Sequence, residues 1–194
     1  MKIQVIIGTT RPNRFSEIPA NWIYQELKKI EGIEAELVDL RDYNLPFFDE
    51  PKSPTAAGIG GYTAEAVVRW TKKVAEADGY IIVTGEYNHG YPAVLKNALD
   101  YVYFEWNKKP VGFISYGSVS GARVIEQLRQ VVVELQLVPV KNSIHIPGQV
   151  VMAIKKGEGG ENPFESLNAQ KDSFITNLVW WVKALKVARE ADKN

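Results

Sequence analysis

The sequence predicts an α/β fold, in which one parallel sheet carries helices on both of its faces. Short runs of apolar and β-branched residues alternate along the chain with longer stretches whose apolar residues recur at helical spacing. The unbroken run Tyr80–Thr84 is typical of a strand that is covered on both faces. The length of 194 residues suits one domain, residues 1–194, and we find neither an internal repeat nor a second domain.

The apolar runs place the individual elements. Five strands are expected, at 3–7, 34–40, 80–84, 110–115 and 138–146. Helices are expected from residue 17, from about residue 63, over 93–102, around Ile125 and Leu128, and from about residue 168. The final helix should bury Phe174, Leu178, Trp181 and Leu185. We interpret 42–62 as a packed arm with a flexible continuation over 52–61, and 147–164 as a loop.

Charge and composition exclude several classes of function. Lysine and arginine together number 23, as do aspartate and glutamate, so no net field recruits nucleic acid or an anionic membrane. No apolar run approaches the roughly 18 residues of a membrane helix. The chain enters a strand without a signal-like leader, so we expect a cytoplasmic protein. The absence of cysteine excludes thiolate metal sites and cysteine nucleophiles, and two histidines argue against a histidine-rich metal site.

The loop that follows the first strand has the composition of a phosphate site. Thr9, Thr10 and Ser16 offer hydroxyls, and free amides are expected at the start of the next helix. Arg11 and Arg14 add positive charge, so the loop can bind a dianion that the helix dipole also attracts. Ser16 is expected to be the N-cap of that helix, with Glu17 in its first turn. The alternative is a solvated connection whose arginines face water.

The turn after the third strand, Gly85–Tyr91, suits a flat ligand with polar edges. Ligands of parallel sheets bind beyond the carboxyl ends of the strands, where this turn lies. Tyr87 and Tyr91 offer stacking faces, and Asn88 offers paired donor and acceptor groups. Gly90 leaves room for close approach of the backbone. The isoalloxazine ring of a flavin fits this description.

A third loop, Tyr116–Gly121, supplies backbone amides and two hydroxyls at the same edge of the sheet. It is not a nucleophile elbow, because the spacing between its glycine and serine is wrong. Gly58–Gly61 is not a dinucleotide fingerprint, and the chain has no Walker motif. A phosphate-type loop after the first strand, beside a ring-type loop after the third, describes a mononucleotide site.

Three stretches carry a resemblance to a known family: GTTRPNRFS at 8–16, GEYNHGYPAVLKNALDY at 85–101, and the segment 105–123. They are similar to the NADPH-dependent FMN reductase family, which has a flavodoxin-like fold. The likeness spans roughly residues 1–145. The family commonly has proline where Gly85 stands, and serine where Thr9 keeps the hydroxyl. The resemblance implies a five-stranded parallel sheet in the order 2-1-3-4-5.

The resemblance also implies which residues bind FMN. The phosphate is expected to meet three side chains and two backbone amides, those of Thr9, Arg11 and Ser16 and of Glu17 and Ile18. The isoalloxazine is expected to meet two loops, largely through backbone groups: Gly85, Glu86, Tyr87 and Asn88 on one side, and Tyr116, Gly117 and Ser118 on the other. No metal site is expected.

The expected function is an oxidoreductase that transfers hydride from NADPH or NADH through bound FMN to a flavin, quinone, azo dye or metal ion. The flavin N5 carries this chemistry, so no protein side chain is expected to be catalytic. We therefore favour a rim role for His89, and a place within the sheet for His145. The alternatives are a flavodoxin-type electron carrier and an interaction protein that senses the redox state of the flavin.

The partners expected are NAD(P)H, a small-molecule acceptor and a second copy of the chain. Tyr101, Tyr103, Phe104 and Trp106 give more aromatic surface than one helix end readily buries, so we expect a homodimer there. The alternative is that these rings pack beneath the 42–62 arm. Trp180 and Val187 offer a second surface, which makes a tetramer a further option.

Overall fold

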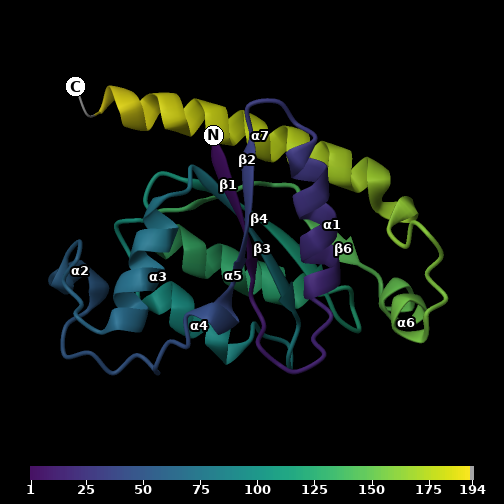
Figure 1. Cartoon of the computed structure of the whole chain (residues 1–194), viewed down its shortest axis with the longest axis horizontal. Coiled ribbons are helices and arrows are strands. Elements are labelled where there is room, and N and C mark those ends of the chain that lie inside the picture. The colour runs from purple at the N-terminus through teal and green to yellow at the C-terminus, as the bar shows by residue number, and fades with distance from the viewer. Residues whose placement is uncertain (193–194) are drawn as a thin grey trace.

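The computed structural model describes residues 1–192 and has a central parallel sheet between two layers of helices (Figure 1). The strands are β1 Lys2–Ile7, β2 Glu34–Asp39, β3 Gly79–Gly85, β4 Pro110–Tyr116, β5 Val138–Pro139 and β6 Ile144–Ile146. Their order is β2-β1-β3-β4-β5, β6 also pairs with β4, and all these pairings are parallel. The predicted fold class and strand order are therefore confirmed.

The last predicted strand, 138–146, is split in two. On β4, Val111 pairs with Pro139 and Ile114 pairs with Ile144. The two β4 residues are three positions apart, whereas their partners are five positions apart. The edge therefore carries two extra residues, as in a bulge. Pro139 has no amide to donate at this point. The Arg129 guanidinium holds the bulge by donating to the Lys141 carbonyl at 2.8 Å.

The five predicted helices lie where the apolar periodicity placed them, and the structure adds two more, α2 and α6. They are α1 Glu17–Lys28, α2 Pro54–Ala57, α3 Glu65–Ala75, α4 Ala93–Asp100, α5 Ala122–Glu134, α6 Gly148–Lys156 and α7 Asn168–Ala191. The prediction of a loop over 147–164 was wrong, because Val150, Val151 and Ile154 share one side of α6 and pack on the core. The short helix α2 likewise lies within the continuation that was expected to be flexible.

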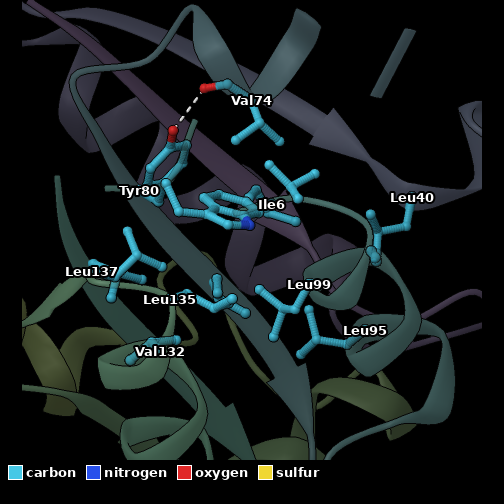
Figure 2. Close-up of a cluster of buried hydrophobic side chains, with 14 of the residues drawn as sticks. Ile6, Leu40, Val74, Tyr80, Leu95, Leu99, Val132, Leu135 and Leu137 are labelled. Atoms are coloured by element: carbon cyan, nitrogen blue, oxygen red, sulfur yellow. Dashed lines mark hydrogen bonds between the residues drawn. The ribbon is translucent and has the colours of Figure 1, made fainter. Parts of the chain in front are cut away.

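One face of the sheet is covered by α3, α4 and α5. Ile6, Tyr80, Ile82 and Phe113 point toward these helices and are fully buried. Figure 2 shows part of this cluster, in which the Tyr80 hydroxyl donates to the Val74 carbonyl at 2.6 Å. Burial raises the pKa of Tyr80 well above its ordinary value, so the hydroxyl keeps the proton that it donates.

The opposite face is covered by α1 and α7, which crosses the top of Figure 1. A Cβ on Gly112 would lie 2.5 Å from the Phe174 ring, so this glycine allows α7 to approach the sheet closely. Gly79 does the same for Val182, whose side chain a Cβ would meet at 2.6 Å. The buried side of α7 consists of Lys171, Phe174, Ile175, Leu178 and Val182. Burial of Phe174 and Leu178 is confirmed, whereas Trp181 and Leu185 are only partly buried.

The arm 42–62 packs on α4 through backbone groups. The Asn97 side chain donates to the Pro46 carbonyl at 2.6 Å and accepts from the Phe48 amide at 2.8 Å. The Tyr101 ring lies edge-on to Phe48, with 5.1 Å between the ring centroids, and it is 1% exposed. Tyr101 therefore takes the alternative packing beneath the arm.

Trp106 is also buried, in contact with the rings of Trp70 and Tyr80. Of the four rings expected at a subunit interface, Phe104 is exposed and Tyr103 is partly exposed. The aromatic surface on which the dimer prediction rested is therefore largely buried within the chain itself.

Asp78 ties both ends of the described chain to the amino edge of the sheet. Its carboxylate accepts hydrogen bonds from Lys186 and Arg189 of α7 and from the Lys2 amide, each at 3.0 Å. Burial alone would raise the pKa of Asp78, but the hydrogen bonds from Lys186 and the Lys2 amide lower it below its ordinary value. Asp78 is therefore a charged anchor for α7.

Replacing Asp78 with Asn is expected to lower the free energy of unfolding by about 2 kcal/mol at neutral pH, because charge-assisted hydrogen bonds are lost. The folded-state pKa lies below the unfolded value of about 3.9. The contribution is therefore complete above about pH 4 and is lost as the pH falls through the folded-state pKa. Urea unfolding at about pH 7 and about pH 3 should show a smaller difference between the two proteins at the lower pH. An equal difference at both would contradict the assignment.

Candidate functional site

The carboxyl ends of β1, β3 and β4 bring three loops together at one edge of the sheet. The parallel register places Gly85 of β3 beside Tyr116 of β4. The Gly8 amide, at the end of β1, donates to the Val83 carbonyl at 2.8 Å. The three loops singled out in the sequence, 8–16, 85–91 and 116–121, are therefore neighbours.

The first loop is anchored by a buried arginine. The Arg14 side chain is 1% exposed, and its guanidinium donates to the Thr9 carbonyl, to Asp39 and to Glu17. Burial would lower the pKa of Arg14, but the hydrogen bonds to Asp39 and Glu17 raise it above its ordinary value. The expectation that Arg14 joins Arg11 in binding a dianion is thus wrong, because its donors are already engaged inside the fold.

Three hydroxyls meet beneath this loop. Thr9 and Ser16 are fully buried, and their hydroxyls hydrogen-bond to each other. Burial raises the pKa of Tyr116, and the neighbouring hydroxyls of Ser16 and Thr9 oppose that rise. Ser16 occupies the N-cap position of α1 but makes no side-chain cap, so the amides at the helix start are left to other acceptors.

The backbone amides of the loop differ in what they can still bind. The Ile18 amide donates to the Phe15 carbonyl at 3.0 Å, which corrects the expectation that it is free for a phosphate. The amides of Thr10, Arg11 and Glu17 make no hydrogen bond within residues 1–192. The loop therefore presents free N–H donors, which suit an anion.

Arg11 links the first loop to the second. Its side chain is exposed, and its guanidinium carbon lies 5.3 Å from the centre of the Tyr87 ring. A cation over an aromatic face is attracted by the ring electrons. The cation for an anionic group and the ring for a flat ligand are therefore adjacent.

The second loop is a tight two-residue turn. Tyr87 and Gly90 exchange both backbone hydrogen bonds, at 2.9 and 3.0 Å. The residues between them, Asn88 and His89, have φ of 49° and 72°, which are the signs of a type I′ turn. Asn88 and His89 therefore carry the left-handed backbone of the turn, whereas Gly90 has no positive φ. Asn and His enter this region more readily than most side chains, which the sequence could have signalled.

Gly85 and Glu86, which precede the two-residue turn, contact the third loop and the helix that follows it. A Cβ on Gly85 would lie 3.0 Å from the Tyr116 ring, so the glycine makes room for that ring. The Glu86 amide donates to the Tyr116 carbonyl at 2.9 Å, and its carboxylate accepts from Arg123 at 2.7 Å. The Glu86 amide is therefore engaged, whereas that of Asn88 makes no hydrogen bond within the described chain.

The third loop completes the edge. Tyr116 lies edge-on to Phe15 of the first loop, with 4.9 Å between the ring centroids. Gly117 accepts from the Ser120 amide at 3.0 Å, and Ser118 is exposed. Tyr116 thus touches both other loops, and Gly117 and Ser118 lie at the rim.

Two residues of this edge were missed in the sequence. Asp39 ends β2, and Arg41 follows it and donates to the Thr10 carbonyl at 3.1 Å. Because β2 pairs with β1 in parallel, the carboxyl end of β2 must lie beside the first loop. The strand order therefore contained the signal.

The donors fit FMN. Free amides, Arg11 and the hydroxyl cluster match a terminal phosphate, and Tyr87 offers a ring face. The Oε2 atom of Glu86 is buried without a hydrogen-bond partner in residues 1–192, which leaves an acceptor for a ligand N–H. Within the same residues, no group of three or more His, Asp or Glu is arranged to hold a metal ion. No helix of the described chain is both long and apolar enough to cross a bilayer. Fold and site together define a mononucleotide-binding α/β protein.

Comparison with known proteins identifies the family. Residues 1–150 match the NADPH-dependent FMN reductase family. An NAD(P)H-dependent FMN reductase of Schizosaccharomyces pombe is 40% identical over 148 residues, which cover 75% of this chain and 74% of that protein. An FMN-dependent NADPH-azoreductase of Staphylococcus aureus is 31% identical over 146 residues, 74% of this chain and 76% of its own. The solved structure of FerB, a flavoenzyme NAD(P)H:(acceptor) oxidoreductase from Paracoccus denitrificans, matches with a TM-score of 0.69 at 20% identity, over 94% of this chain and 97% of that one.

The chain belongs to the NADPH-dependent FMN reductase family. It is an NAD(P)H-dependent oxidoreductase, with FMN as its cofactor and NAD(P)H as its electron donor. The predicted family, enzyme class and cofactors are therefore confirmed.

Replacing Arg11 with Ala is expected to weaken FMN binding by about 1.5–3 kcal/mol, because a charge-assisted contact is lost while the exposed side chain is not needed for folding. Titration of the cofactor-free protein, followed by flavin fluorescence, measures the change. Lys183→Ala, which removes an exposed cation from α7, serves as the control and should leave FMN affinity unchanged. Equal affinities in the two variants would remove Arg11 from the site.

Replacing His89 with Gly is expected to stabilise the protein by about 0.5–1 kcal/mol, because a non-glycine residue no longer has to adopt a left-handed backbone. The imidazole is exposed, and the contact that the residue makes with Gln127 uses its carbonyl. Flavin reduction should therefore persist within about threefold of the parent rate, since hydride transfer to flavin needs no general base. Loss of NADPH-dependent reduction with FMN still bound would instead make His89 catalytic.

Proposed function

We propose that residues 1–194 form one FMN-binding domain in which the first loop holds the phosphate and the other two flank the isoalloxazine. The observation that carries this proposal is the contact between Arg11 and Tyr87, which sets a cation beside an aromatic face. Thr9, Ser16 and the Glu17 amide would complete the phosphate site. The ring would lie between two groups of residues, Gly85, Glu86, Tyr87 and Asn88 on one side and Tyr116, Gly117 and Ser118 on the other.

The protein's part in the reaction is to bind FMN and to orient it toward NAD(P)H and the acceptor. The chemistry that FMN supplies when bound is the acceptance of hydride from NAD(P)H and its delivery to an acceptor. Free loop amides, such as that of Asn88, are donors suited to negative charge on a reduced ring. Hydride transfer to flavin needs no general base, so water can supply the remaining proton and His89 can keep a rim position.

We propose a small planar acceptor, with a quinone as the leading candidate. A cavity of about 430 Å³ borders the ring turn at Tyr91 and is also lined by Phe47 and by the Lys96–Asp100 ion pair. Aromatic walls with a polar edge suit a flat molecule that carries carbonyl oxygens. A relative from Burkholderia sp, 28% identical over 200 residues, is a 2-hydroxy-1,4-benzoquinone reductase, which supports this choice.

We propose a homodimer in a cytoplasmic setting. The exposed apolar surface that supports the dimer is smaller than the sequence indicated. It consists of the side chains of Phe47, Ile59 and Phe104. Trp180 and Val187, also exposed, leave a tetramer as the further option. Sedimentation of the FMN-bound protein at micromolar concentration tests the dimer, and an active monomer would overturn it.

Steady-state oxidation of NADPH with and without a benzoquinone tests the proposed reaction. Catalytic turnover that depends on the quinone is the expected result. A single stoichiometric reduction of bound FMN, without turnover for quinone, free flavin or an azo dye, would instead favour the electron carrier. Turnover with an azo dye but no quinone would replace the proposed acceptor.

A further inference from the structure

Two guanidinium groups hold three successive carbonyls of the first loop. Arg14 donates to the Thr9 carbonyl. Arg41 donates to the Thr10 carbonyl through Nε at 3.1 Å, and to the Arg11 carbonyl through Nη2. These hydrogen bonds direct the three carbonyl groups toward two positively charged side chains.

The arginines are themselves fixed by two carboxylates. Asp39 accepts from both terminal nitrogens of Arg14 and, at 2.9 Å, from the backbone amide of Arg41. Glu17 accepts from Arg14 at 2.8 Å and from Arg41 at 3.2 Å. The fork geometry of guanidinium lets one side chain meet a carboxylate and a carbonyl together, which an ammonium does less well.

Because the peptide bond is planar, fixing the carbonyl groups of the loop also fixes the direction of its N–H groups. In a trans peptide the carbonyl of one residue and the N–H of the next point in opposite directions. With the carbonyls of Thr9 and Thr10 held by the arginines, the N–H groups of Thr10 and Arg11 must point away from them. Neither N–H makes a hydrogen bond within residues 1–192.

We propose that Arg41, with Arg14 and Asp39, is a positioning residue that directs the free amides of the first loop toward the FMN phosphate. The inference rests on the proposed phosphate site and assigns Arg41 no contact with FMN. Its role is geometric, so positive charge alone at position 41 does not replace it.

The test compares FMN with riboflavin, which has the same ring but no phosphate. The dissociation constant of each is measured on the cofactor-free, full-length protein for the parent, Arg41→Met and Arg41→Lys. Arg69→Met is the matched control. Arg69 likewise donates to a backbone carbonyl, that of Asp42, but this carbonyl lies outside the first loop. Inorganic phosphate is added as a competitor.

For Arg41→Met we expect the dissociation constant of FMN to rise about tenfold, the equivalent of about one charge-assisted hydrogen bond. The riboflavin constant should change by less than about twofold, since the phosphate contacts alone are affected. Arg41→Lys should recover less than half of the loss on a logarithmic scale, because one ammonium cannot span two carbonyls. Arg69→Met should match the parent for both ligands.

Full recovery by Arg41→Lys, or equal weakening of FMN and riboflavin, would overturn the inference. Asp39→Asn gives a second measurement in case the Arg41 variants fold poorly, and it should also weaken FMN selectively. Failure of the phosphate site itself is recognised in the parent protein, which would then bind riboflavin as tightly as FMN and ignore inorganic phosphate. If the inference alone fails, the parent still binds FMN more tightly than riboflavin, and Arg41→Met shows the same preference.

Discussion

Burial of β3 on both faces is the constraint on which the rest of the structure depends. All seven residues of this strand, Gly79–Gly85, are buried, so it requires neighbours on both edges and helices above and below. Connections between parallel strands must cross over the sheet, and a helix is the usual crossover. The alternation of strands and helices along the chain is therefore a consequence of covering one strand completely.

The same constraint assembles the site. When strands run parallel, their carboxyl ends share one edge, and loops that are far apart in sequence become neighbours there. Tyr116 contacts both of the other loops. It pairs with Gly85 in the sheet, packs on Phe15, and brings its hydroxyl to Ser16.

The sequence was informative wherever a pattern is local. The positions of the strands, the buried face of α5 and the three loops followed from periodicity and turn composition. The strand order is not local, and it was implied by the family resemblance. The split of 138–146 was missed because Val140 and Ile144 are both buried. The polar triplet between them, Lys141–Ser143, interrupts the apolar run and marks the bulge. The helix α6 was missed because Pro147 and Gly148, which begin it, are typical of loops.

Side-chain roles within the site depended on tertiary neighbours. Arg14 and Arg11 are indistinguishable by composition, yet one is buried against Asp39 and the other is exposed beside Tyr87. The difference is set by β2, whose last residue supplies the carboxylate. Periodicity places β2 in the chain but does not say which arginine its carboxylate will meet. Composition alone therefore left both arginines as candidates for the anion.

The attachment of the arm to α4 has a consequence for divergence within the family. Asn97 binds the backbone on either side of Phe47, and the Tyr101 hydroxyl donates to the carbonyl of Phe47 itself at 3.2 Å. The side chain of Phe47 takes no part in these contacts and is 79% exposed. Substitutions at this position therefore leave the arm in place while they reshape one wall of the cavity beside Tyr91. Position 47 can therefore vary the wall of the proposed acceptor cavity without loosening the attachment of the arm.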